Sequence, residues 1–289
     1  KHDAPIVALA NQYGSAEVAL FGAQTLSYRP TGNPPVLYLP HPYDETPAGA
    51  EIHGGIPVCW PWFARCGPAG SKLHGVARYA RWRVTGSEYS EDVTEVTLAL
   101  ESDAETRKAW PHDFALELKV SVSMKLTLAL RATNTGTEAF HVTEGFHPYF
   151  LVRERDQTEV LGVDGCEFTD TRAPEKGVRT WTGSYAVREA GSKIYQVTKR
   201  EYVLMDHGLN RAIAVVSRGN ARLVVWNPGE ESADQVAAFG VDGWRHFVCV
   251  EPCSTPDEAG YDLKPGESHD LLMAVQSVPN DGSVHARHP

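Results

Sequence analysis

Apolar and polar residues alternate with a period of two along much of the chain. The alternation is clearest at 93–100, 115–122 and 124–131, and it recurs at 221–226 and 247–250. Because successive side chains of a strand point to opposite faces of a sheet, this pattern predicts half-buried β-strands. The strands follow one another without the helices of roughly 10–15 residues that separate parallel strands in α/β folds. The pattern therefore predicts an all-β, antiparallel fold.

A turn signal lies between two of the apolar runs. Residues 134–137 read Asn-Thr-Gly-Thr, which predicts a hairpin formed by 124–133 and 138–145. No internal repeat, low-complexity run or change of composition marks a linker. Residues 1–289 are therefore predicted to form a single domain.

Only two short helices are predicted. Ser102 and Glu105 have the spacing of a capping box, and the helix that they open must end before Pro111. The second predicted helix covers 230–238, directly after an Asn-Pro-Gly turn.

The overall charge limits the possible partners. The chain contains 27 Lys and Arg against 37 Asp and Glu, a formal net charge of −10, whereas a general nucleic-acid binder carries a basic face. No apolar run approaches the roughly 18–20 residues of a membrane helix, and residues 1–10 lack the layout of a signal peptide. We expect a cytoplasmic protein that binds neither nucleic acid nor membrane. Its 5 cysteines, odd in number and without C-x-x-C spacing, predict reduced thiols, not disulfides or structural zinc.

A loop rich in glycine, proline and aromatic residues occupies 53–63. Its glycines and prolines prevent a regular strand or helix. Trp60, Trp62 and Phe63 could form the floor of a sugar pocket, because aromatic faces match the apolar face of a pyranose. The alternative is that they belong to the core beneath a long loop.

A second polar segment contains His74 and Arg78, with Arg81 three residues further on. A histidine and an arginine four positions apart around a glycine can converge on one anion, and guanidinium binds phosphate or hydroxyl groups in a bidentate manner. The alternative is an arginine in an ordinary surface loop.

Three further residues are candidates for acid–base chemistry. His147 lies where a predicted strand ends before a proline, and histidine transfers protons near neutral pH. Glu251 follows the apolar strand 247–250, and burial of a carboxyl raises its pKa toward the range of a general base. Asp206 ends another short apolar run. The alternatives are a structural histidine, a buried glutamate that accepts backbone N–H groups, and a turn-forming aspartate.

The ordered set of motifs resembles a known family. The motifs are G-G-I-P-V-C-W-P-W-F at 54–63, H-G-V-A-R at 74–78, T-E-G-F-H-P-Y-F ending at 150, and W-N-P followed by V-C-V-E-P within 226–252. From about residue 21 to residue 274 the chain resembles the aldose 1-epimerase (galactose mutarotase-like) superfamily, and within it the glucose-6-phosphate 1-epimerase branch. This resemblance implies a large antiparallel β-supersandwich with its pocket on one concave sheet.

The resemblance also implies roles for individual residues. His147 would be the general acid and Glu251 the general base, while His74, Arg78 and Asp206 would contact the sugar or its phosphate. Trp62, His53 and Arg81 are the remaining candidates for substrate contacts. No metal and no organic cofactor are expected, and the expected partner of a monomeric enzyme is a small sugar or sugar phosphate.

One position departs from the sugar-phosphate branch. That branch usually has arginine directly before G-G-I-P, where this chain has His53. Neutral imidazole binds phosphate less well than guanidinium, so Arg78 would need help from Arg81, Lys72 or a protonated His53. The predicted function is anomer interconversion of an aldohexose 6-phosphate. A mutarotase of a free aldose, a non-catalytic carbohydrate-binding protein and a glycoside hydrolase remain as alternatives, although the last needs two opposed carboxylates.

Overall fold

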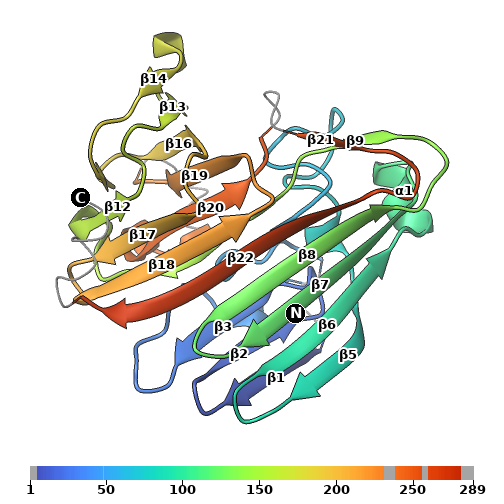
Figure 1. The fold of residues 1–289 in the computed structure, drawn as a ribbon, viewed down its shortest axis with the longest axis horizontal. Helices are drawn as coiled ribbons and strands as arrows, with labels where there is room; N and C mark the ends of the chain where they lie inside the picture. Colours follow the sequence, from blue (N-terminus) through green and yellow to red (C-terminus); the bar gives the residue numbers. More distant parts are fainter. Residues whose placement is uncertain (1–4, 48, 231–237, 256–259, 281–289) are drawn as a thin grey trace.

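Antiparallel sheets dominate the computed structural model, which describes residues 5–47, 49–230, 238–255 and 260–280 (Figure 1). The all-β prediction is confirmed. The largest sheet has nine strands in the order β15-β12-β17-β18-β22-β8-β7-β6-β5. Its strands are β5 (Arg83–Tyr89), β6 (Thr94–Glu101), β7 (Phe114–Val122), β8 (Leu126–Asn134), β12 (Thr158–Leu161), β15 (Tyr185–Ala186), β17 (Glu201–Asp206), β18 (Arg211–Arg218) and β22 (Ser268–Pro279).

An eight-stranded sheet lies behind the long strands of the first (Figure 1). Its order is β14-β13-β16-β19-β20-β10-β4, and β11 also pairs with β20. The strands are β4 (Val58–Cys59), β10 (Gly145–Phe146), β11 (Tyr149–Leu151), β13 (Glu167–Asp170), β14 (Arg179–Thr180), β16 (Gly191–Gln196), β19 (Arg222–Asn227) and β20 (Phe247–Cys253).

Two small sheets and a few short helices complete the described part of the chain. The small sheets are β1 (Ile6–Asn11), β2 (Gly14–Ala19) and β3 (Thr25–Pro30), and β9 (Phe140–Val142) with β21 (Tyr261–Leu263). The helices are α1 (Ala104–Ala109) and the 3-10 turns η1 (Tyr43–Glu45), η2 (Ala77–Tyr79), η3 (Arg155–Gln157), η4 (Pro174–Lys176) and η5 (Gly243–His246). Among the described residues, no helix is long and apolar enough to cross a membrane.

The main core fills the space between the two large sheets. Leu98 and Leu118 from the nine-stranded sheet belong to the same buried cluster as Val225, Val248 and Val250 from the eight-stranded sheet. In β6 and β7 every second residue is buried, as the alternation predicts. The prediction of a single domain stays a prediction.

The predicted hairpin is wrong. β8 pairs with β7 and β22, whereas β9 pairs with β21 in a separate small sheet. The cause lies in Asn134, whose amide donates to the carbonyl oxygens of Glu138 and Leu263, both at 2.8 Å, and whose side-chain oxygen accepts from the Gly136 N–H at 2.9 Å. These bonds fix the turn after β8 in a shape that directs the following residues away from the nine-stranded sheet and toward β21.

The first predicted helix is present, but its cap is shifted by one residue. Asp103, not Ser102, is the N-cap, and it forms a reciprocal capping box with Thr106. The helix ends at Ala109, before Pro111 as predicted. The second predicted helix, 230–238, lies largely outside the described residues, which omit 231–237.

Candidate active site

β20 places Glu251 on the face of the eight-stranded sheet that is opposite the main core. Val248 and Val250 point into that core, so the intervening Cys249 and Glu251 point the other way. Glu251 lies opposite Val224 of β19, and its side chain is only 2% exposed. The alternation along β20 therefore places a carboxyl group in a buried position on this face of the sheet.

His147 lies between β10 and β11, and its ring meets Glu251. The His147 Nδ1 and Glu251 Oε2 atoms are 3.6 Å apart, although 104 positions separate the two residues in the sequence. The His147 backbone N–H donates to the Pro57 carbonyl at 3.1 Å, which links its position to the glycine-proline loop. Its Nδ1 atom is buried and has no hydrogen-bond partner among the described residues.

Burial shifts both pKa values of this pair toward the uncharged forms. Desolvation raises the pKa of Glu251 well above its ordinary value. Desolvation, together with the positive charge of Arg78, lowers the pKa of His147 to about 3. Both shifts favour a carboxylic acid beside a neutral imidazole in the ligand-free pair.

His74 is a second histidine at the site. Its ring lies edge-on to that of His147, with 5.1 Å between the centroids. The Ala64 N–H donates to His74 Nδ1 at 3.0 Å, so Nδ1 is the acceptor and Nε2 carries the hydrogen. Burial, followed by the neighbouring His147, holds the pKa of His74 well below its usual value, which keeps it a neutral donor.

The loop that carries His74 has an unusual backbone. His74 has a φ of +63°, and the next residue, Gly75, has a φ of +84°. A Cβ atom at Gly75 would lie 2.0 Å from the Trp60 carbonyl oxygen, so only glycine allows this close approach. Such strained positions gather at functional sites, where the surrounding structure holds them in place.

Arg78 is buried close enough to His147 for its charge to act on that ring, and it lies beside Glu51, an acid that was not predicted from the sequence. The Glu51 carboxylate lies 3.4 Å from Arg78 Nη1 and 3.5 Å from His53 Nε2, and it accepts a hydrogen bond from the Tyr79 hydroxyl at 3.1 Å. Arg78 is 3% exposed and its Nε has no hydrogen-bond partner among the described residues. Desolvation lowers the pKa of His53, although Glu51 opposes this effect.

Aromatic rings surround His147. Its ring stacks on Tyr149 at 4.7 Å, with an interplanar angle of 5°, and meets the edge of Trp226 at 5.6 Å. Phe63 lies against His74 at 5.1 Å. Trp226 was part of a sequence motif but had no predicted role, and its place opposite Cys249 on β20 could not be read without the strand pairing.

Three of the predicted substrate contacts lie elsewhere. Trp62 packs into the main core, and its indole N–H donates to the Lys72 carbonyl at 2.9 Å. Arg81 is exposed and lines a different hollow, together with Trp62 and Lys72.

Asp206 ends β17 in the nine-stranded sheet, 0% exposed and 3.5 Å from Arg211. Its oxygen accepts the Leu209 N–H at 3.1 Å, which is the turn-forming alternative. Asp206 thus belongs to the other large sheet and is ion-paired with Arg211, and its predicted contact with the sugar stays a prediction.

None of the five cysteines forms a disulfide in the described part of the chain. Cys249 lies next to the acid–base pair, and donor atoms of His147, Cys249 and Glu251 all lie within 4.8 Å of one another. Among the described residues, this is the group with the spacing to hold a metal ion. Burial raises the pKa of the Cys249 thiol well above its usual value. Proton transfer to and from a sugar needs only the imidazole and the carboxyl.

Known proteins resemble this chain over most of its length. The family model described as "Aldose 1-epimerase" matches residues 5–276. An Escherichia coli protein named "Putative glucose-6-phosphate 1-epimerase" is 33% identical over 238 residues, covering 82% of this chain and 78% of that protein. A Salmonella typhimurium protein of the same name is 32% identical over 252 residues, covering 86% and 83%. A Salmonella typhimurium crystal structure, described provisionally as a mutarotase, matches with a TM-score of 0.87 at 28% identity and covers 96% of this chain and 91% of that one.

Proposed function

Because the chain belongs to the aldose 1-epimerase family, we propose that it interconverts the α and β anomers of an aldohexose 6-phosphate. The observation that carries this proposal is the 3.6 Å approach of His147 to Glu251, two buried groups beside the rings of Tyr149 and Trp226. Ring opening needs one group that accepts a proton and one that donates a proton, and this pair supplies both.

The reaction conserves the protons of the pair. Glu251 accepts the proton of the C1 hydroxyl while His147 donates a proton to the ring oxygen, and the bond between C1 and the ring oxygen breaks to leave an aldehyde. The C1–C2 bond rotates, and the ring closes on the other face of C1 with the two roles exchanged. Each general acid or base contributes a factor of about 10²–10⁴.

The single proton of the pair must be on the imidazole for this assignment. In the ligand-free protein, burial favours neutral His147 beside protonated Glu251. The alternative, an imidazolium beside a carboxylate, contains the same number of protons. We propose that the C1 hydroxyl, by donating a hydrogen bond to Glu251, stabilises the carboxylate and moves the proton to His147. His74, with its hydrogen on Nε2, would donate to a sugar oxygen.

The pH dependence follows from the directions of these shifts. The pair becomes fully protonated only when the imidazole titrates, and its lowered pKa, about 3, lies far below the ordinary 6.5. The pair becomes fully deprotonated only when Glu251 titrates, well above its ordinary 4.5. Catalysed exchange should therefore not fall as the pH is lowered from 7 to about 5, measured by NMR after subtraction of the buffer rate. A fall centred near pH 6.5 would contradict this account.

We propose that Arg78 binds the phosphoryl group, with His53 beside it. Glu51 lies in the position that an anion would take, between Arg78 and His53, and so competes with the substrate phosphate. Its charge compensates the buried guanidinium while the pocket is empty. This competition gives Glu51 a direct influence on whether a phosphorylated or a free sugar is preferred.

Replacing Glu51 with Gln should therefore lower the KM for glucose 6-phosphate by roughly tenfold, because one negative charge facing the phosphate is removed. The KM for free glucose should change by less than about twofold, so the ratio of the two values is the quantity to measure. Glu45→Gln is the matched control, since Glu45 lines the same hollow as Glu51 and His53 but is exposed, whereas Glu51 is the acid ion-paired with Arg78. A KM for the phosphate ester that rises would mean that Glu51 positions Arg78 instead.

A direct assay tests the function itself. Freshly dissolved α-glucose 6-phosphate and α-glucose would each be followed by NMR with and without the protein. Exchange no faster than in buffer for both compounds would remove the epimerase proposal and favour a carbohydrate-binding protein. Faster exchange of free glucose than of its phosphate would replace the substrate and leave the reaction unchanged. A monomeric state and a cytoplasmic location remain parts of the proposal.

A further inference from the structure

A cavity of about 710 Å³ lies at the edge of the eight-stranded sheet formed by β13, β14 and β16. It collects positive charge on a chain whose net charge is −10. The cations that line it are Arg155, Arg172, Lys176, Arg179, Arg188 and Lys193. Three acids, Asp170, Glu189 and Glu230, also line it, and Arg155 forms an ion pair with a fourth, Asp156, at 2.7 Å, so six positive charges against four negative leave an excess of two.

The cavity is on the opposite face of the sheet from the acid–base pair. Lys193 of β16 lies opposite Val225 of β19, whereas Glu251 lies opposite the next residue, Val224. Neighbouring residues of a strand point to opposite faces, so Lys193 and Glu251 are on different sides of the sheet. The cavity is therefore a separate site, and binding of a ligand there does not depend on the proposed epimerase activity.

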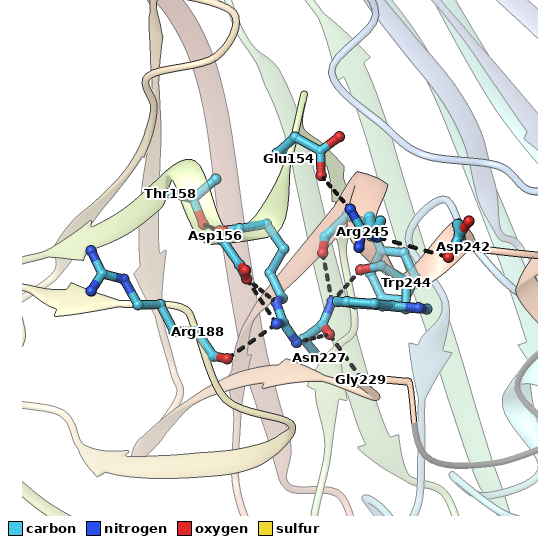
Figure 2. A network of polar contacts seen from close by, with 11 residues as sticks. Glu154, Asp156, Thr158, Arg188, Asn227, Gly229, Asp242, Trp244 and Arg245 are labelled. Carbon is cyan, nitrogen blue, oxygen red and sulfur yellow. Dashed lines mark hydrogen bonds and ion pairs between the residues drawn. The ribbon is translucent and has the colours of Figure 1, made fainter.

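Two of the cations are held in place by the protein. Lys193, 5% exposed, binds Asp170 at 3.0 Å and Glu189 at 2.9 Å. Arg155 donates to the Asn227 side chain at 3.2 Å and to the Arg188 carbonyl at 3.1 Å, and it lies over the Trp244 ring at 4.5 Å. Figure 2 shows how the labelled Asn227, Arg188 and Trp244 converge in this network. These contacts give the cavity a fixed wall, in which Lys193 is paired with two of the three lining acids.

Arg179 lines the cavity with a guanidinium group that has unpaired hydrogen-bond donors. Its guanidinium lies on the Phe168 ring at 4.6 Å, and its Nη2 is 3.8 Å from the Asp170 carboxylate, too far for a hydrogen bond. Both Nε and Nη2 are buried and have no hydrogen-bond acceptor among the described residues. These two nitrogens form one edge of the guanidinium fork, which matches two oxygens of an oxyanion.

Arg188 and Lys176 add exposed charge at the same cavity. Figure 2 shows the Arg188 guanidinium pointing away from the network that its carbonyl joins. A small shift of Arg179 toward an anion would satisfy its two buried donors, and Arg188 could then approach the same anion. Trp181 and Phe168 supply aromatic surface beside these groups.

We propose that this cavity is a second binding site, for a small phosphate monoester. The two excess positive charges suit a group with a charge near −2, the Arg179 fork suits its oxygens, and the aromatic walls suit the remainder of a small metabolite. A cavity of this volume is within the usual range for small-molecule sites.

The test uses inorganic phosphate as the probe and the tryptophan indole signals in ¹H–¹⁵N NMR as the readout. Trp181 and Trp244 line the cavity, and single Trp→Phe variants would assign their signals. Both should shift saturably with phosphate, in the wild type and in Arg78→Gln, whose active-site cation is removed. Arg179→Gln should weaken the fitted Kd roughly tenfold. Arg188→Gln, at an exposed position, provides the same test should Arg179→Gln fail to fold, and it should also weaken binding.

The control is Arg83→Gln, which removes an exposed arginine that is ion-paired with Glu101 on the other large sheet. It should bind phosphate like the wild type. Sodium chloride at equal ionic strength should give no saturable shift. Loss of the Trp181 and Trp244 shifts in Arg78→Gln, or wild-type affinity in both Arg179→Gln and Arg188→Gln, would overturn the proposal.

Discussion

Replacing Glu251 with Gln should slow catalysed anomer exchange by about 10²–10⁴-fold and at the same time stabilise the protein at neutral pH. The amide has the shape of the carboxyl but cannot accept the proton of the C1 hydroxyl. Activity falls for this reason, and the rate would be measured by NMR with α-glucose 6-phosphate.

The gain in stability follows from the direction of the pKa shift. Burial raises the pKa of Glu251 in the folded protein above the ordinary 4.5. Above pH 4.5 the unfolded chain releases this proton while the folded chain keeps it, and folding is penalised by about 1.4 kcal/mol for each unit of difference. Gln has no such penalty. The gain should be absent at pH 4 and should grow as the pH rises toward 7.

Thermal unfolding at pH 4 and pH 7 would measure this gain. Glu91→Gln is the control, because Glu91 is exposed and its replacement should leave the melting temperature unchanged at both pH values. A lower melting temperature for Glu251→Gln at pH 7 would show that the carboxyl stabilises the fold. It would contradict the inference that this buried carboxyl lowers the stability of the protein.

Replacing Arg211 with Met should destabilise the protein by about 3–5 kcal/mol, because it leaves the buried Asp206 without a counter-ion. Arg211 also donates to the carbonyl oxygens of Pro35 and Leu151, so three groups lose a partner at once. Leu151 belongs to β11, which follows His147, and the loss of this contact should also reduce activity.

Chemical denaturation would measure this loss, with Arg218→Met as the control. Arg218 ends the same strand, β18, but is exposed, so its replacement should cost less than about 0.5 kcal/mol. Desolvation already raises the pKa of Asp206. The penalty in Arg211→Met should therefore shrink as the pH falls toward 4 and the carboxyl becomes neutral. An Asp206→Asn/Arg211→Met variant as unstable as Arg211→Met would show that the carbonyl contacts, not the charge, decide the effect.

The sequence allowed the strands to be predicted because their alternation is a local pattern, whereas the pairing of Glu251 with His147 came from the resemblance to the family. The period-two runs at 115–122 and 124–131 are adjacent strands of one sheet, β7 and β8. Glu251 was identified as a desolvated acid because it follows an apolar strand, and its pKa shift has the predicted direction. The motifs then associated it with His147.

The features that were predicted wrongly or missed depend on the path of the irregular segments between strands, which has no periodic pattern in the sequence. Asn134 directs the chain away from a hairpin through bonds to Glu138 and Leu263, and the second partner is distant in sequence. Trp62 and Phe63 are neighbours in one loop, yet the first enters the core and the second lies at the site.

Glu51 was missed for the same reason. It precedes His53 in an irregular stretch, and only the folded chain brings it to Arg78.

The two faces of the eight-stranded sheet can vary independently. Along β19 and β20, the side chains on the face of Glu251 alternate with those that fill the main core, so Val224 and Trp226 point away from the layer that contains Val225 and Val250. A combinatorial library limited to Val224, Trp226 and Ile194 should therefore yield many folded variants with altered sugar preference. The same arrangement would let natural selection diversify substrate choice in such a sheet while the scaffold stays intact.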